Sequence, residues 1–312
     1  MKITVEKANK LAKICRVELQ SKQFFTPIFF PSLSSTEVDY QKHYNWLLKQ
    51  KPEIFMSSAY DLNQKKLKQI SNLNAITCLD SGGFELKKNE KNTSWTIEDQ
   101  IKIIEKMNFH IIITLDFPIH KKEGKYFSIR NEILINNYKI IEQIVGKKSL
   151  ICFSFTENKK FLINQIESIL SQINPKAVAI PESHLGVNFV ERKEMLCSIK
   201  NTINQLSNNE VLLHIRGCSD PDLIIQYVQN GADIFDGLGW TRKVIKWFEF
   251  DKKNNFDIEN KWHIEFDLGK LSDCDCKGCK RAKRGDYLDR LFKHNNFAYR
   301  KLINDVHEQI KS

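Results

Sequence analysis

Short apolar runs recur along the chain and are separated by longer stretches in which apolar residues follow a helical spacing. The runs are rich in β-branched and aromatic residues, which is typical of buried strands. The eight runs are residues 27–31, 53–57, 75–79, 111–115, 150–155, 177–180, 211–215 and 232–235. The helices predicted between them are residues 38–50, 97–107, 131–144, 160–173, 192–206 and 221–229.

An alternation of strand and helix repeated eight times predicts an α/β fold of the (β/α)8 barrel type over residues 26–250. A doubly wound open sheet is the alternative. Apolar positions at 3–5 and 14–19 predict an antiparallel β cap within residues 1–25. The chain becomes more polar after the eighth run. Residues 251–312 are therefore predicted to form a zinc-binding subdomain that ends in a helix over 284–310.

The chain is basic, with 48 Lys and Arg against 38 Asp and Glu, a formal net charge of +10. This excess suggests a polyanionic partner, most simply nucleic acid, although a lysine- and asparagine-rich composition would produce it too. There is no signal-peptide pattern, and no apolar run approaches the roughly 20 residues that span a bilayer. Eight cysteines without a secreted-type framework favour thiols or metal ligands, so we expect a soluble, cytoplasmic protein.

Two aspartates directly follow apolar runs and precede glycines. Asp80 stands before Ser81-Gly82-Gly83, and Asp236 stands before Gly237. Barrel active sites lie at the C-terminal ends of the strands, where isolated polar residues otherwise serve as helix caps. The residues that follow the third, fourth, sixth, seventh and eighth runs are Asp80, Asp116, Glu182, Arg216 and Asp236. Two carboxylates at one mouth could divide nucleophilic and acid/base work.

A cluster of three cysteines, Cys274, Cys276 and Cys279, lies in the polar segment after the eighth run. Three thiolates and one histidine make a closed tetrahedral zinc site. His307 is the preferred fourth ligand, because a metal bound there would attach the last helix to the barrel, and His294 is the second choice. With four protein ligands and no open position, the zinc is expected to be structural.

With these residues assembled, the chain resembles the tRNA-guanine transglycosylase family, whose members exchange guanine in a polynucleotide for a 7-deazaguanine base. The likeness runs from about residue 26 to residue 307. Residues 26–31 (TPIFFP) are similar to the family's first barrel strand, 58–62 (SAYDL) to its Asn-Thr-Tyr-His-Leu segment, and 80–84 (DSGGF) to its signature loop. Residues 231–236 (GADIFD), with Thr241-Arg242, are similar to its nucleophile segment, and the cysteine triplet with a trailing histidine to its zinc site.

The resemblance implies the barrel fold, one structural zinc, a possible homodimer and a mechanism. Asp236 would attack C1′ of the target nucleoside and form a covalent glycosyl-enzyme, while Asp80 would serve as general acid and base for the departing and incoming bases. Asp116 would read the guanine edge and Phe84 would stack on the base, which must leave the helix. The expected base-binding residues are Ser81, Gly82, Gly83, Phe84, Asp116, Glu182, Arg216 and Gly217.

The chain also departs from the family pattern. Ser154 stands in place of a glutamine that contacts the base, and Glu85 in place of the signature glutamine. The loop after the sixth strand is replaced by a segment with Glu182 and His184, and Trp240 stands where proline is common. Together with the compact length and the lack of an appended RNA-binding domain, these changes resemble the branch that inserts 7-deazaguanine bases such as preQ0 into DNA.

Three alternatives remain open at this point. The first is an enzyme that acts on tRNA. The second is a non-catalytic nucleic-acid-binding subunit, which would be expected to lose a catalytic aspartate. The third is an unrelated metal-dependent hydrolase, which would need metal ligands at the strand ends. In each nucleic-acid reading, basic and aromatic residues near the mouth and the zinc would contact the polynucleotide. The expected set is Trp240, Arg242, Lys243, Lys280, Arg281, Lys283 and Arg284.

Overall fold

The computed structural model describes residues 1–35, 40–50, 52–64, 74–83, 85, 95–116, 127–207, 210–241, 243–247, 262–265, 271 and 274–312. Two residues of the expected site, Phe84 and Arg242, lie outside this described part of the chain. Their expected roles therefore stay predictions.

Eight parallel strands form a closed barrel, which confirms the predicted fold and excludes the open sheet. The strands are β4 (Ile28–Leu33), β5 (Ile54–Ser58), β6 (Ile76–Asp80), β7 (Ile111–Ile113), β8 (Leu150–Ser154), β9 (Ala177–Pro181), β10 (Leu212–Arg216) and β11 (Ile234–Gly237). The barrel closes where β11 pairs with β4, with Asp236 opposite Phe30. This pairing brings the last strand next to the first.

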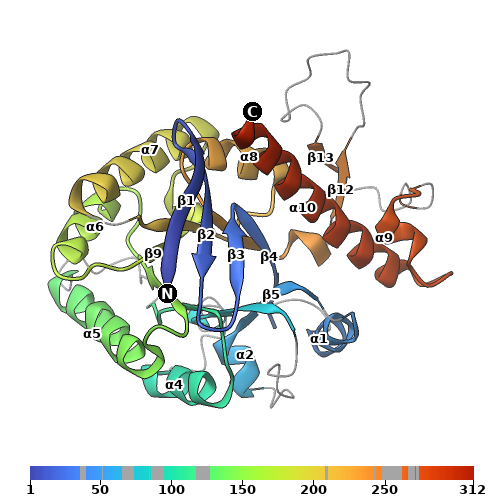
Figure 1. Cartoon of the computed structure of the whole chain (residues 1–312). Coiled ribbons are helices and arrows are strands. Elements are labelled where there is room, and N and C mark those ends of the chain that lie inside the picture. The colour runs from blue at the N-terminus through green and yellow to red at the C-terminus, as the bar shows by residue number, and fades with distance from the viewer. Residues whose placement is uncertain are drawn as a thin grey trace.

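Helices follow the strands and surround the barrel (Figure 1). They are α1 (Tyr40–Lys49), α2 (Ala59–Gln64), α4 (Ile97–Lys106), α5 (Phe127–Val145), α6 (Leu162–Leu170), α7 (Phe189–Leu206) and α8 (Pro221–Gln229). Two short 3₁₀ turns, η2 (Glu182–His184) and η3 (Gly239–Thr241), follow β9 and β11.

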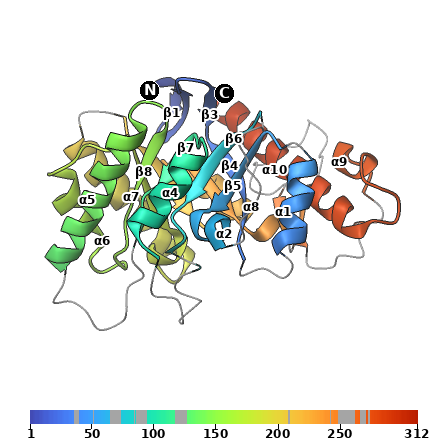
Figure 2. The ribbon, with the colours of Figure 1, turned by 90° about the horizontal axis from the view of Figure 1, so that it is seen from below.

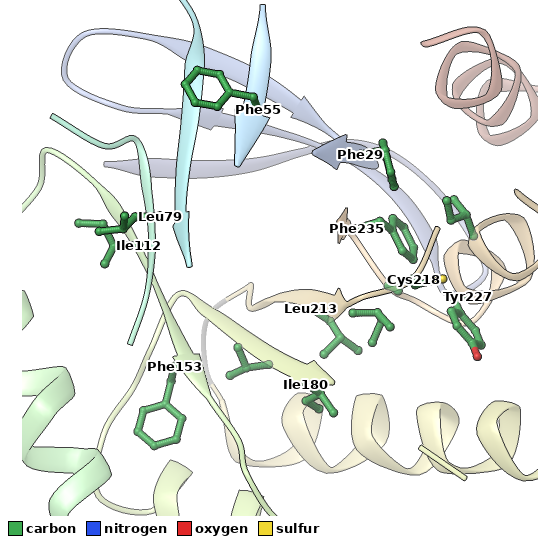
Figure 3. Close-up of a cluster of buried hydrophobic side chains, with 14 of the residues drawn as sticks. Phe29, Phe55, Leu79, Ile112, Phe153, Ile180, Leu213, Cys218, Tyr227 and Phe235 are labelled. Atoms are coloured by element: carbon green, nitrogen blue, oxygen red, sulfur yellow. The ribbon is translucent and has the colours of Figure 1, made fainter. Parts of the chain in front are cut away.

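Successive residues of each strand alternate between two apolar layers, as the period of two in a strand requires. Phe55, Leu79 and Phe153 belong to the layer outside the barrel, which packs against the helices. The side chains labelled in Figure 3 belong to this outer layer. Met56 and Cys78, one position away, belong to a separate cluster that fills the barrel interior. The core is thus divided by the barrel wall.

An antiparallel sheet of β1 (Lys2–Asn9), β2 (Ala12–Glu18) and β3 (Gln23–Thr26) covers one end of the barrel, as predicted. Its Val17 and Phe24 belong to the same cluster as Ile28, Ile111 and the other inward residues that begin the strands. The sheet therefore closes the N-terminal end, and the opposite end is left for a site. Figure 2 shows β1 and β3 on the side where both chain ends are marked.

The segment after the barrel contains the hairpin β12 (Val244–Trp247) and β13 (Trp262–Glu265), then α9 (Lys277–Lys280) and α10 (Tyr287–Lys311). The last helix begins three residues later than predicted because the Asp286 carboxylate caps it, accepting from the Asp289 N–H at 3.0 Å. Tyr299 of α10 stacks on Phe29 of β4, with ring centroids 3.9 Å apart. No described helix is both long and apolar enough to cross a membrane.

Candidate active site and metal centre

The inward face of the barrel changes from apolar to polar at the C-terminal ends of the strands. On β6, for example, Ile76 and Cys78 point into the apolar interior and Asp80 comes next on the same face. The polar residues reached in this way are Ser32, Ser58, Asp80, Ser154, Arg216 and Asp236. The same period of two that builds the core thus delivers a ring of polar side chains to one mouth.

The Arg216 guanidinium joins two of the predicted carboxylates. Its Nη2 donates to Asp80 Oδ1 at 2.7 Å and its Nη1 to Asp116 Oδ2 at 2.7 Å. Nη1 also donates to Ser154 Oγ at 3.0 Å, and Ser154 Oγ in turn donates to Asp116 Oδ2 at 3.1 Å. Ser154, which the resemblance aligns with a glutamine, therefore belongs to this hydrogen-bonded group.

Burial and the shared guanidinium shift the two carboxyl groups in opposite directions. Burial raises the pKa of Asp80, with further contributions from the charges of Asp116 and Asp236, although Arg216 opposes it. Burial also acts to raise the pKa of Asp116, but the Arg216 charge and the hydrogen bonds to that carboxylate outweigh it, and its pKa is lowered. Asp80 is thus better suited to carry a proton, and Asp116 to remain an acceptor.

The signature loop brings Ser81, Gly82 and Gly83 against these carboxylates. Ser81 Oγ donates to Asp116 Oδ1 at 2.5 Å, and the Gly82 N–H donates to Asp80 Oδ2 at 3.3 Å. Gly82 adopts a φ of 87°, and a Cβ on Gly83 would lie 2.5 Å from Asp116 Oδ1, so both positions require glycine. The Trp95 indole donates to the Ser81 carbonyl at 2.9 Å and anchors the loop.

Asp236 lies at the same mouth and is 6% exposed. Its Oδ1 receives the Gly217 N–H at 3.3 Å and lies 2.8 Å from Nε2 of His214. The structure therefore brings Ser81, Gly82, Gly83, Asp116, Arg216 and Gly217 together around Asp80 and Asp236, and their roles in base binding and catalysis stay predictions. A conjunction of carboxylates, one cation and backbone N–H groups can supply a nucleophile, a proton donor and hydrogen bonds to a planar base.

Glu85, which the resemblance aligns with a glutamine, is also buried at this end of the barrel. The Ser34 hydroxyl donates to Oε1, and Ser58 Oγ donates to Oε2 at 3.0 Å. Burial, together with the charges of Asp80 and Asp61, raises the pKa of Glu85 to about 8. At neutral pH the side chain is therefore mostly protonated, which makes it similar in charge to a glutamine.

The structure does not bring Glu182 to the other base-binding candidates. Its Oε1 accepts from Arg192 Nη1 of α7 at 2.7 Å and from the Tyr227 hydroxyl of α8 at 3.2 Å. Ala179 points into the barrel and Ile180 points outward, whereas Glu182 lies beyond the strand in η2 and is held by these partners on α7 and α8. These contacts connect η2 with two helices, and base contact by Glu182 stays a prediction.

Trp240 is likewise not placed for contact with nucleic acid. It is fully buried, its Nε1 donates to the Ser32 carbonyl at 2.8 Å, and its ring lies 5.0 Å from Phe292 and 6.2 Å from Trp46. The predicted stacking role was wrong because the aromatic group fills the junction between η3, α1 and α10. Lys243 is partly buried nearby, whereas Lys280, Arg281, Lys283 and Arg284 are exposed around α9.

Cys274, Cys276 and Cys279 converge with His294, and their ligand atoms all lie within 4.8 Å of one another. His294 Nδ1 is 3.4 Å from Cys274 Sγ and 3.5 Å from each of the other two sulfurs. Tetrahedral zinc, with bonds of about 2.0–2.3 Å, needs ligand separations of roughly 3.5–3.8 Å. His294 Nε2 donates to the Ile245 carbonyl at 2.7 Å, which leaves Nδ1 unprotonated toward the sulfurs. The cluster therefore suits a structural zinc, which would attach α9 to α10.

His307, the preferred fourth ligand, was the wrong histidine. It follows His294 by thirteen residues on the same helix, which corresponds to roughly 20 Å along the axis. Its Nε2 instead donates to the Pro27 carbonyl at 3.1 Å, beside β4. A sequence signal for His294 was present in Asp286, a helix-capping residue that follows Cys279 closely. A helix that begins there has its first turns, which carry His294, nearer to the cysteines than its last turns, which carry His307.

Sequence reasoning missed the parts played by His214, Ser154 and Glu85. His214 and Ser154 could have been found by counting in steps of two along a strand, from Arg216 and from Cys152. Glu85 could not, because its contacts with Ser34 and Ser58 join three separate segments of the chain.

Comparisons with known proteins agree with this geometry. Queuine tRNA-ribosyltransferases from Treponema denticola, Natranaerobius thermophilus and Koribacter versatilis are 30%, 29% and 27% identical over 139, 138 and 194 residues. These segments cover 44%, 40% and 61% of the chain, and 35%, 37% and 45% of the respective relatives. The chain thus spans less than half the length of the curated relatives it matches. The family model described as queuine tRNA-ribosyltransferase, however, matches residues 8–311. Since that match covers nearly the whole chain, the protein belongs to this family, the tRNA-guanine transglycosylases.

Proposed function

We propose that the protein exchanges guanine in a polynucleotide, with DNA as the acceptor, for a 7-deazaguanine base such as preQ0. The observation that carries the proposal is the meeting of Asp236, Asp80 and Asp116 at one barrel mouth, with Arg216 between the last two. An isolated polar residue after a strand is an ordinary cap. Three carboxylates that share one mouth are costly to bury, and such groups are typical of functional sites.

In the proposed reaction, Asp236 attacks C1′ of the target nucleoside and forms an ester bond as the C1′–N9 bond breaks. The departing guanine keeps the electron pair of that bond and receives a proton from Asp80, whose pKa is raised by burial. Asp80 then takes the N9 proton of the incoming base. N9 attacks C1′, the ester bond breaks, and Asp236 is released as a carboxylate.

The altered base pocket supports DNA as the acceptor. Ser154 takes the place of a glutamine and fastens Asp116 to Arg216, while the loop after β9 directs Glu182 toward the helices. A base pocket with these changes need not keep the acceptor of the parent enzymes. The relatives are named queuine tRNA-ribosyltransferases, and these names support the second candidate acceptor, tRNA, for the same exchange reaction.

The polynucleotide would approach over the exposed cations around α9, namely Lys280, Arg281, Lys283 and Arg284. Arg242 and Lys243, which follow Asp236 in the sequence, are also proposed to contact the polynucleotide. Such contacts hold the phosphates while the target base is flipped into the mouth. None of the eight cysteines is in a disulfide, and three of them form the metal cluster, which fits a reducing compartment, and we propose the cytoplasm as the site of action. A homodimer is also part of the proposal.

The test is base exchange with purified protein, labelled guanine or labelled preQ0, and duplex DNA, single-stranded DNA or tRNA in separate reactions. Label that enters DNA but not tRNA, and is lost in Asp236→Ala, supports the proposal. Label that enters tRNA alone replaces DNA by tRNA as the acceptor. Nucleic-acid binding without exchange in any acceptor would favour the non-catalytic subunit. Metal-dependent hydrolysis without exchange would favour the unrelated hydrolase.

A further inference from the structure

His214 lies beneath the proposed nucleophile and is fully buried. It occupies the middle of β10, where its neighbours in register are Ala179 of β9 and Ile234 of β11. Both neighbours belong to the apolar cluster inside the barrel. A histidine is therefore placed in a layer that is otherwise built from small and aliphatic side chains, where an unpaired polar group is costly.

The imidazole has one hydrogen-bond partner within the described part of the chain, the carboxylate of Asp236. Its Nε2 lies 2.8 Å from Asp236 Oδ1, whereas its buried Nδ1 has no partner there. Since a carboxylate oxygen can only accept, Nε2 carries the proton and donates it. The side chain thus contributes a single directed hydrogen bond, and that bond ends on the group proposed to attack C1′.

Both donors to Asp236 converge on the same oxygen. The Gly217 N–H donates to Oδ1 at 3.3 Å, and His214 donates to that oxygen as well. No described residue donates to Oδ2. The carboxyl torsion of an aspartate is broad and roughly two-fold, so the two oxygens would exchange places without such contacts. The two N–H groups that donate to Oδ1 therefore make the two carboxylate oxygens inequivalent. Oδ2 is the oxygen that receives no hydrogen bond from a described residue.

We propose that His214 is a positioning residue that fixes Asp236 with Oδ2 as the attacking oxygen. This inference rests on the proposed base exchange. In the ester intermediate, Oδ2 is bonded to C1′ and Oδ1 is the carbonyl oxygen. When the incoming N9 displaces the ester, negative charge returns to the carboxylate, and the hydrogen bonds at Oδ1 stabilise it. His214 thus assists both the formation and the breakdown of the intermediate.

The test compares wild type with His214→Met, which removes the donor, and His214→Gln, which keeps an N–H of similar reach. A hydrogen bond to a charged group contributes about 1.5–3 kcal/mol, which corresponds to roughly 10- to 100-fold in rate. We expect H214M to slow single-turnover formation of the covalent adduct by that factor, with KM for polynucleotide and base within about two-fold of wild type. H214Q should recover most of the rate.

The control is His110→Gln, at the N-terminal end of β7, which should exchange bases at the wild-type rate. If H214M fails to fold by its thermal transition, His214→Ala takes its place. Wild-type rates in the donor-free variant, or H214Q as slow as H214M, would overturn the positioning role. An Asp236→Ala variant that still exchanged bases would instead overturn the proposed function, so the two failures are distinguishable.

Discussion

Two clusters of charged side chains, mostly buried, lie at opposite ends of β10 and β11. At the N-terminal end, Lys13 of the β sheet pairs with Glu210 and lies 3.6 Å from Asp233, and Lys200 of α7 lies 3.7 Å from Glu210. At the C-terminal end are Asp80, Asp116, Asp236 and Arg216. The first cluster has two cations for two carboxylates, and the second has one cation for three.

This difference in charge balance distinguishes a cluster that stabilises the fold from one that is suited to a reaction. Burying charge is costly unless opposite charges lie nearby. In the N-terminal cluster two lysines balance two carboxylates, so no bound proton or ligand is needed to balance the charge. The mouth has an excess of carboxylates, to which Glu85 adds a fourth, and the excess is balanced only by bound protons or by a ligand. Burial raises the pKa of Asp80 and of Glu85, and the neighbouring carboxylates raise both further.

The largest expected effect comes from Asp236→Asn. The substitution keeps the shape of the side chain but removes the nucleophilic carboxylate, so we expect base exchange to fall by roughly 10⁴-fold or more. Exchange kinetics on the acceptor that proves active, together with a thermal melt, measure this. Asp233→Asn, three residues earlier at the other end of β11, is the matched control and should exchange bases at nearly the wild-type rate. If both variants lost exchange activity to a similar extent, the contrast between a reactive and a structural end of the barrel would not hold.

Asp233→Asn should act on stability instead. It leaves Lys13 and Lys200 with one carboxylate between them, and removing one partner of a buried pair costs about 3–5 kcal/mol. Urea unfolding at pH 7 measures the loss. A transition midpoint unchanged from wild type would contradict a structural role for the N-terminal cluster.

Glu85→Gln should change how stability depends on pH. The native carboxyl holds its proton up to a pKa of about 8, against 4.5 for an unperturbed glutamate. Between these values the native state binds more protons than the unfolded state, so stability falls as pH rises from about 4.5 to 8. A glutamine side chain does not titrate, so it makes no such contribution to the pH dependence of stability. We therefore expect E85Q to gain about 2–4 kcal/mol over wild type near pH 8 and nothing below pH 4.5.

Unfolding at pH 4, 6 and 8 tests this expectation, with Glu105→Gln as the exposed control on α4. The control should follow wild type at every pH. A constant offset between E85Q and wild type would assign the effect to packing instead of titration.

The smallest expected effect concerns the surface. Replacing both Arg281 and Arg284 by Ala should weaken polynucleotide binding and reduce the slope of log K against log salt by about 1.4–1.8, at about 0.7–0.9 per phosphate contact. Lys7 and Lys10, exposed on the N-terminal sheet, are the matched pair at the other end of the barrel. Their replacement should leave the slope unchanged, and an equal change in both pairs would remove the α9 region from the footprint.

The barrel could be predicted from sequence because its strands are buried on both faces and read as continuous apolar runs. The mouth residues Asp80, Asp116, Arg216 and Asp236 could be predicted because position at a strand end determines position at the mouth. Both inferences use the local spacing of residues along single elements.

The rest depends on contacts between elements. Glu182 follows a strand as Asp80 does, but Arg192 and Tyr227 hold it between helices. Trp240 lies beside the nucleophile segment and still belongs to the core, because the α10 side chain Phe292 packs against it. The choice of His294 over His307 required the starting point and direction of α10, which no spacing between cysteine and histidine provides.

The contacts of α10 also determine the order of events during synthesis. Pro27, at the start of the first barrel strand, accepts from His307, 280 residues later. Until α10 has been translated, Phe29 on this same strand therefore lacks the Tyr299 ring that covers it in the finished protein. The fourth metal ligand, His294, emerges after the three cysteines. A truncated nascent chain thus carries neither a closed metal centre nor a completed barrel wall, and it exposes apolar surface that the finished protein covers.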